Sequence, residues 1–232
     1  YYVSILVDGD LRYLKDNNID NFNDNASWIK KELPKSNNII GIDYGINTFI
    51  TTSDGVKYDN IKSIRNNEKR LKKAQRQHSR KKKGSKNREK SRVKLAKLHD
   101  KIHNQKLNYL HHITNELLDE NQVIVIEDLN IKDMMKNHKL AKAIQELSIS
   151  ENNRILEYKA KWYDRQIIKV DRYYPSSKLC SNCNHKNTEL ELKDRNWICS
   201  SCSVEHDRDL NASINIKNEG IRILSTQNQN KT

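Results

Sequence analysis

The four cysteines of this chain stand in two pairs, and each pair has the spacing of a metal-binding knuckle. Two residues separate Cys180 from Cys183, two separate Cys199 from Cys202, and 15 residues lie between the pairs. This spacing is typical of four thiolates around one tetrahedral zinc ion. Two disulfides are the alternative, but the cysteines within one knuckle are badly placed to bridge each other. We therefore predict a structural zinc ion, and a small lobe that folds only with it.

Length and composition limit the remaining possibilities. The 232 residues suffice for one domain with a full core and a small accessory lobe. Charged residues make up 31% of the chain, and no stretch approaches the roughly 18 apolar residues of a membrane span. We expect a soluble protein without a membrane partner, in a reducing compartment that is most simply the cytoplasm.

The positive charge of the chain is concentrated in one segment. Residues 62–106 hold nineteen basic and three acidic residues, a local net charge of +16, whereas the whole chain carries +13. Such a segment is typical of a surface that binds the phosphates of a nucleic acid, although a solvated helix face or an address signal has a similar composition. The residues predicted to bind nucleic acid are Arg76, Arg80, Lys81, Lys82, Lys83, Lys86, Arg88, Lys90 and Arg92.

The apolar pattern predicts an α/β protein. Three strands come first, then a long basic helical hairpin (61–121) that Gly84 and Ser85 divide into two arms. A central strand, an amphipathic helix, a further strand, the cysteine lobe and a last helix follow. This order predicts a ribonuclease H-like fold, in which a mixed sheet is flanked by helices. The expected strands are 39–42, 48–52, 56–58, 123–126 and 167–170, and the expected later helices are 140–162 and 208–218.

Three acidic residues end or begin elements that such a sheet brings together. Asp43 follows the first strand, Glu127 follows the central strand, and Asp209 opens the last helix. Ligand sites in open α/β sheets form outside the carboxyl ends of strands. Each acid alone is more often a turn former or a helix cap, but together they predict a site for Mg²⁺ or Mn²⁺. Two neighbouring acids, Asp128 and Asp207, are assigned supporting roles.

Several separate motifs resemble those of the TnpB/OrfB proteins of insertion sequences and occur in the same order. Proteins of this family are compact RNA-guided DNA endonucleases related to type V CRISPR effectors. The resemblance covers residues 36–222. It rests on the four cysteines and on the segments Gly41–Ile46, Lys81–Glu89, Ile126–Asn130, Tyr158–Tyr163, Pro175–Lys178 and Glu205–Ile216.

The resemblance implies an RNA-guided, metal-dependent DNA endonuclease of a transposable element. Its nuclease domain is of the RuvC type, with Asp43, Glu127 and Asp209 as catalytic acids that bind magnesium in a two-metal mechanism. The implied partners are target DNA and a guide RNA transcribed from the end of the element, in a bacterial or archaeal cell and associated with the nucleoid. Supporting roles fall on Asp207, Arg208, Asn211 and Asn130.

The domain plan follows from the same resemblance. Because the chain has no initiating methionine, we expect it to start inside a larger protein, with residues 1–36 as the remnant of an N-terminal wedge and recognition domain. A RuvC-like nuclease domain (37–173), an inserted zinc ribbon (174–205), the last nuclease helix (206–222) and a disordered tail (223–232) follow. Asn184 and Ser203 stand where the family usually has glycine after each knuckle.

Two other functions remain open on the residues alone. A nuclease-inactive binding module, either a guided repressor or a decayed transposase fragment, would bind nucleic acid tightly through residues 62–106 without cutting it. A zinc-ribbon transcription factor would explain the cysteines but would leave Asp43 and Glu127 without a role. The oligomeric state stays open.

Overall fold

The computed structural model describes residues 33–61, 63–191 and 193–229. At its centre lies a five-stranded sheet in the order β3-β2-β1-β4-β5. Strand β1 is parallel to β4 and antiparallel to β2, and β4 is parallel to β5, so the sheet is mixed as predicted. The strands are β1 (Ile39–Tyr44), β2 (Thr48–Thr52), β3 (Lys57–Asp59), β4 (Val123–Glu127) and β5 (Gln166–Val170).

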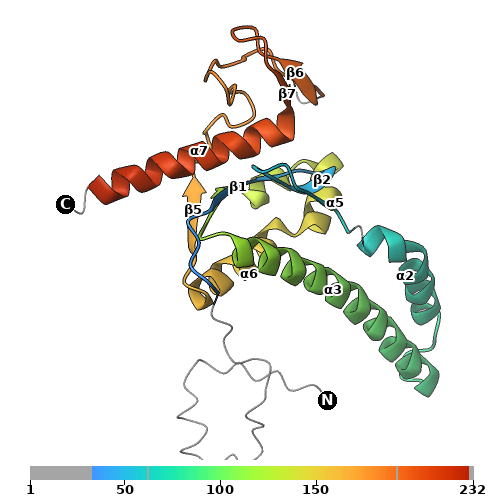
Figure 1. Cartoon of the computed structure of the whole chain (residues 1–232). Helices are drawn as coiled ribbons and strands as arrows, with labels where there is room; N and C mark the ends of the chain where they lie inside the picture. The colour runs from blue at the N-terminus through green and yellow to red at the C-terminus, as the bar shows by residue number, and fades with distance from the viewer. Residues whose placement is uncertain (1–32, 62, 192, 230–232) are drawn as a thin grey trace, which may run out of the picture. The chain divides into compact units, whose positions relative to one another are not determined.

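Helices cover both faces of this sheet. On one face, Ile42 and Ile126 join a buried cluster with residues of α3, α5 and α6. On the other, Val125 and Ile168 pack with Ile216 of α7, since side chains alternate between the faces of a strand. Figure 1 shows α7 on one side of the sheet and α3 and α6 on the other. The helices are α2 (Ser63–Ser79), α3 (Lys86–Glu120), α4 (Ile131–Met134), α5 (His138–Leu147), α6 (Ile149–Trp162) and α7 (Arg208–Gln229).

Two glycines allow α7 to pack closely on the sheet. A Cβ atom on Gly41 of β1 would lie 2.2 Å from the backbone oxygen of Ser213, and one on Gly220 of α7 would lie 2.4 Å from a methyl of Val125. Neither distance is sterically possible, so both positions require glycine, which has no Cβ atom. The resulting contact fixes α7 along β1 and β4, the two strands that end in Asp43 and Glu127.

The basic segment forms the predicted helical hairpin, α2 followed by α3 (Figure 1). Gly84 turns the chain with a φ of 79°, and the side chain of Ser85 accepts the backbone N–H of Arg88 as the N-cap of α3. The base of the hairpin is anchored by Glu146 of α5, which is buried. Its carboxylate accepts the backbone N–H of Arg65 at 3.1 Å and lies 3.1 Å from the Arg65 guanidinium.

Two helix predictions are wrong. The single helix expected over 140–162 is divided at Ser148, whose left-handed backbone (φ 54°) separates α5 from α6. The last helix extends to Gln229, not to 218 or 222, so residues 223–229 are not a disordered tail. Ile223 and Leu224 pack against the α7 face of the sheet, and this apolar contact explains the extension.

The N-terminal boundary also differs from the prediction. The compact unit begins at Leu33, not after residue 36. The carbonyl of Pro34 accepts the Arg165 guanidinium at 2.8 Å, and the Ser36 hydroxyl donates to the Glu120 carbonyl at 3.1 Å. Residues 1–32 of the expected N-terminal remnant lie outside the described residues. Among the described residues, no helix is long and apolar enough to cross a membrane.

The close approach at Gly41 predicts a large loss of stability on Gly41→Ala. The new Cβ must displace the backbone of α7, so we expect the free energy of unfolding to fall by more than about 2 kcal/mol, which urea titration would measure. Gly55→Ala is the matched control, because Gly55 has a φ of 92° with no atom within 4 Å and should lose only about 1 kcal/mol. Equal losses in the two variants would contradict the packing argument.

Candidate functional site

Asp43 and Glu127 lie at the same edge of the sheet. In the parallel register of β1 and β4, Ile42 is opposite Ile126, and the next residue on each strand is the acid. Neighbouring strands are about 4.8 Å apart, so the two carboxylates start from adjacent positions. By strand alternation both point to the face that α7 covers, the face of Gly41 and Val125.

Asp209 reaches this edge from the first turn of α7. Burial, followed by the negative charges of Glu127 and Asp209, raises the pKa of Asp43 well above its ordinary value. The positive charges of Arg208 and Arg195 oppose this rise. The structure thus brings the three predicted acids into one electrostatic cluster, which we call the acidic centre (Asp43, Glu127 and Asp209).

Asp207 has a different role from Asp209. Its carboxylate accepts the backbone N–H groups of Asp209 and Leu210, each at 3.0 Å, and so caps the start of α7. It also pairs with Lys57 at 2.7 Å. Burial alone would raise the pKa of Asp207, but the Lys57 ammonium and the two amides hold it below its usual value. Because Asp207 caps the helix, the carboxylate of Asp209 is available to the acidic centre, with the Arg195 guanidinium 3.4 Å away.

The neighbours of Glu127 orient it. Burial raises the pKa of Glu127, and the hydroxyl of the buried Ser176, which donates to its Oε1 at 2.5 Å, acts in the opposite direction. Asp128 is exposed and pairs with Arg172 at 2.8 Å, as expected for a residue that alternates away from the centre. Ser176 was missed by sequence reasoning as a partner of Glu127, because 49 residues separate the two.

The four cysteines converge as predicted. Their Sγ atoms all lie within 4.8 Å of one another, and the pairs Cys180–Cys202 and Cys183–Cys199 are each 3.6 Å apart. A disulfide requires about 2.05 Å, whereas four sulfurs about 2.3 Å from one metal ion lie just under 4 Å from each other. The donor set therefore fits a structural zinc ion and excludes two disulfides.

His206 is a second residue that the sequence did not reveal. Its Nε2 lies 3.0 Å from the Sγ of Cys180, and its ring packs on Trp197 with centroids 4.8 Å apart. Both rings are buried, and they come from the paired strands β6 (Asn196–Ile198) and β7 (Glu205–Asp207). An N–H donated to a thiolate ligand orients that ligand and offsets part of its charge.

The cysteine lobe is bound to α7 by buried side chains. The amide of Asn211 donates to the Leu179 carbonyl at 2.7 Å and accepts the Ser181 N–H at 2.9 Å. Asn215 donates to the carbonyls of Ser176 and Leu179. The buried Arg208 guanidinium donates to the Glu191 carbonyl on the other side of the lobe.

The remaining predicted residues occupy the hairpin and α4. Asn130 caps α4, where its side chain accepts the Asp133 N–H. Of the nine basic residues, Arg88 donates to the Lys81 carbonyl at 2.9 Å and so ties α3 to the turn of the hairpin. Arg92 pairs with Glu89 within α3 at 2.6 Å. Arg76 belongs to α2, Lys86 and Lys90 belong to α3, and the turn between the helices holds Arg80, Lys81, Lys82 and Lys83.

The two residues that replace the family's usual glycines have left-handed backbones. Asn184 has a φ of 61° and Ser203 a φ of 59°, and each donates its N–H to the carbonyl of the first cysteine of its knuckle. Glycine adopts this conformation without steric cost, and asparagine tolerates it better than serine does. Ser203 is therefore the more strained position.

The sheet and the cysteine cluster define the class of this chain. It is a mixed α/β protein with a four-cysteine metal-binding domain. Residues 14–138 match the family of OrfB proteins of IS605 elements, described as "Probable transposase", and residues 150–216 match the TNB domain of Cas12f1-like proteins. The chain therefore belongs to the TnpB/OrfB family.

Individual relatives agree. A "Putative RNA-guided DNA endonuclease" of Streptomyces pristinaespiralis is 44% identical over 81% of this chain and 46% of its own length. A protein of the same description from Escherichia coli K12 is 31% identical over 86% of this chain and 53% of its own. This chain thus spans about half the length of the curated relatives it matches.

The fold also has a counterpart among solved structures. It matches a chain of the Cas12f1–sgRNA–target DNA complex with a TM-score of 0.58 at 18% identity, over 81% of this chain and 51% of that one. At this identity the match supports the fold alone.

Removal of zinc should unfold the cysteine lobe locally. Apparent binding energies of structural zinc ions are roughly 10–16 kcal/mol, more than so small a lobe can replace by apolar burial. After a chelator we expect all four thiols to react with a thiol reagent, while far-UV circular dichroism keeps the signal of the helices. Reloading with zinc is the control, and thiols that stay protected without metal would contradict a zinc site.

The strain at Ser203 predicts that Ser203→Gly stabilises the lobe. Relief of the left-handed conformation should raise the apparent zinc affinity about two- to fivefold, measured by competition with a chelator. Ser201→Gly is the matched control, because Ser201 is an exposed neighbour without a positive φ and should gain nothing. A similar gain in both variants would show that the conformation of Ser203 is not the cause.

Proposed function

We propose that this chain carries the nuclease portion of a metal-dependent DNA endonuclease of a transposable element, RNA-guided in the complete protein. In this proposal the mixed sheet is a ribonuclease H-like domain of the RuvC type, and Asp43, Glu127 and Asp209 are its catalytic acids. The observation that carries the proposal is the acidic centre. There burial, followed by the negative charges of Glu127 and Asp209, raises the pKa of Asp43.

The acidic centre has the chemistry of a divalent cation site. Carboxylate oxygens are the ligands that Mg²⁺ and Mn²⁺ prefer. Burial raises the pKa of both Asp43 and Glu127, and the charges of Glu127 and Asp209 add to the rise at Asp43, so a cation would stabilise the ionised form of Asp43. When bound, two such ions activate a water molecule and stabilise the leaving oxygen in phosphodiester hydrolysis.

Each side chain of the centre has a part that the contacts support. The sheet holds Asp43, and the Ser176 hydroxyl orients Glu127. Asp207 caps α7, so the Asp209 carboxylate is not needed as the cap. The Arg195 guanidinium, 3.4 Å from Asp209, is placed to bind a phosphate of the DNA once a cation occupies the carboxylates.

The hairpin supplies the nucleic-acid surface in this proposal. Basic residues of α2, α3 and the turn between them would contact phosphates of guide RNA and target DNA. The relatives that are described as RNA-guided DNA endonucleases support these two partners. Target recognition would involve parts of the complete protein that correspond to the other half of those relatives.

Cleavage is the direct test. The zinc-loaded chain is incubated with single- and double-stranded DNA, with Mg²⁺ or Mn²⁺ or neither, and we expect metal-dependent cutting that Asp43→Ala and Asp209→Ala reduce by more than about a thousandfold. The matched control is Asp128→Ala, because Asp128 adjoins Glu127 in sequence but faces Arg172 and should retain activity. Cutting that survives Asp43→Ala would contradict the proposed role of the acidic centre.

If the chain alone does not cut DNA, the test is repeated in a full-length protein. If the chain alone binds but does not cut, the same variants are placed in a full-length relative with its guide RNA, at the matching acids. Loss of cutting there supports the assignment, whereas a full-length protein that binds its target and never cuts favours the inactive binding module.

A further inference from the structure

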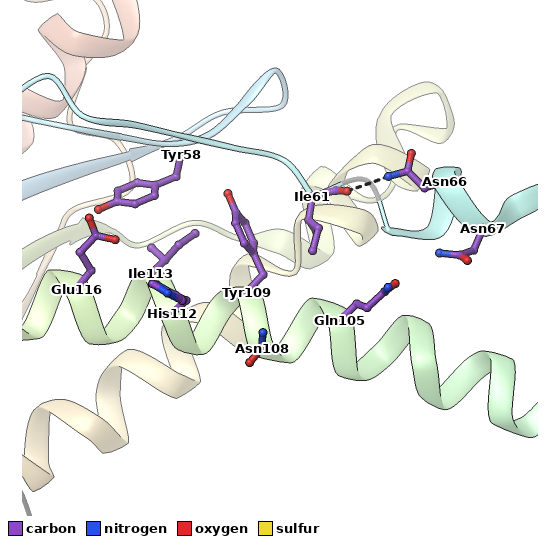
Figure 2. Close-up of a pocket in the computed structure, with 10 residues that line it drawn as sticks. All are labelled: Tyr58, Ile61, Asn66, Asn67, Gln105, Asn108, Tyr109, His112, Ile113 and Glu116. Atoms are coloured by element: carbon purple, nitrogen blue, oxygen red, sulfur yellow. Dashed lines mark hydrogen bonds between the residues drawn. The ribbon is translucent and has the colours of Figure 1, made fainter.

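A hollow of about 600 Å³ lies at the base of the hairpin, where the linker from β3 to α2 passes over α3. Figure 2 shows Tyr58 of β3, Ile61 of the linker and Asn66 and Asn67 of α2 on one side, and six residues along α3 on the other. The acidic centre and the cysteine cluster contribute none of its ten lining residues. Its volume is within the range of pockets that hold small planar ligands.

The lining of the hollow differs from its surroundings in charge. None of the ten lining residues is a lysine or an arginine, although Asn66, Asn67 and Gln105 belong to the basic segment 62–106. The lining contains the tyrosine rings of Tyr58 and Tyr109 and the imidazole of His112, together with carboxamides such as Gln105 and Asn108. The hollow is thus rich in aromatic rings and carboxamides, holds the carboxylate of Glu116, and adjoins the basic part of the hairpin.

The two tyrosines are held in place. The Tyr109 hydroxyl donates to the backbone carbonyl of Asp59, which fixes its ring against the linker. Burial, followed by the charge of Glu116 and a hydrogen bond to it, raises the pKa of Tyr58, so this phenol stays protonated at neutral pH. Rings fixed in this way can stack on a flat ligand with little loss of side-chain entropy.

We propose that this hollow binds one unstacked nucleobase of a single-stranded nucleic-acid segment whose phosphates lie on the hairpin. The inference rests on the nucleic-acid binding of the proposed function and adds a base-reading site to it. Tyr58 and Tyr109 would stack on or flank the base, and Gln105 and Asn108 would bind its edge.

The chemistry of the lining favours a base over a phosphate. A phosphate requires cations or clustered N–H donors, and the lining offers no cation and carries the carboxylate of Glu116. Carboxamides offer a donor and an acceptor side by side, which matches the Watson–Crick edge of a base. Proteins commonly recognise single strands in this way, with the base on aromatic rings and the backbone on a cationic surface.

The test uses the zinc-loaded chain without added Mg²⁺ or Mn²⁺, so that cleavage plays no part. Single-stranded RNA and DNA oligonucleotides with one 2-aminopurine are titrated, and stacking should change its fluorescence. The double variant Gln105→Ala, Asn108→Ala should bind about tenfold more weakly, with the salt dependence unchanged because no phosphate contact is lost. Both positions are exposed on a helix that tolerates alanine, and circular dichroism checks the fold.

Asn104→Ala is the matched control, since Asn104 is an exposed amide of the same helix that does not line the hollow. Lys82→Gln with Lys83→Gln tests the hairpin separately, and its salt slope should fall by about 0.7 for each single-strand phosphate contact removed. An unchanged salt slope there would count against nucleic-acid binding by the hairpin. If the Lys82/Lys83 variant shows the expected fall in salt slope but the Gln105/Asn108 variant binds with wild-type affinity, the base site is overturned and nucleic-acid binding by the hairpin is not.

Binding of a free nucleoside monophosphate distinguishes a site for single-stranded nucleic acid from a site for a mononucleotide. Because the hairpin phosphate contacts are missing from it, it should bind at least a hundredfold more weakly than the oligonucleotide. Equal affinities for the monophosphate and the oligonucleotide would overturn the proposal that the hollow binds a base of a single-stranded nucleic acid.

Discussion

The packing of α7 on the sheet is the contact on which the rest of the structure depends. Gly41 and Gly220 let the helix approach β1 and β4 to a distance that any larger side chain would prevent. The first turn of α7 thereby lies beside the ends of these strands, and Asp209 joins Asp43 and Glu127. The same helix anchors the cysteine lobe through Asn211 and Asn215.

The ionised form of Asp43 is destabilised in the acidic centre. Three carboxylates at one edge of a sheet repel each other, and burial adds to the cost of keeping Asp43 ionised. A fold selected only for stability would replace one of them with a neutral residue. Around the centre the fold instead supplies partial compensation, namely the Ser176 hydroxyl at Glu127 and the guanidinium groups of Arg195 and Arg208. This compensation is partial, so the pKa of Asp43 stays well above its ordinary value.

Local patterns predicted the sheet and the four-cysteine cluster because both depend on short spacings. The apolar runs 39–42 and 123–126 identified parallel strands, and the cysteine spacing identified the metal cluster. Contacts between distant segments left no such pattern. Ser148 and Glu151 have the S-x-x-E spacing of a helix start, but this pattern does not specify the left-handed backbone at Ser148. The length of α7 depends on the contact of Ile223 with the sheet. The partners Ser176 and His206 became visible only when the chain folded back on itself.

These contacts join the acidic centre and the cysteine cluster into one structure. Ser176 binds Glu127 through its hydroxyl and Asn215 through its carbonyl, and Asn215 and Asn211 also bind Leu179, next to the first cysteine. On the other side, β7 carries His206 beside Cys180 and leads directly into the cap of α7 and Asp209. Zinc binding, at roughly 10–16 kcal/mol, would therefore stabilise the positions of Glu127 and Asp209 although neither touches the zinc ligands. The cysteine lobe is thus part of the structural support of the acidic centre.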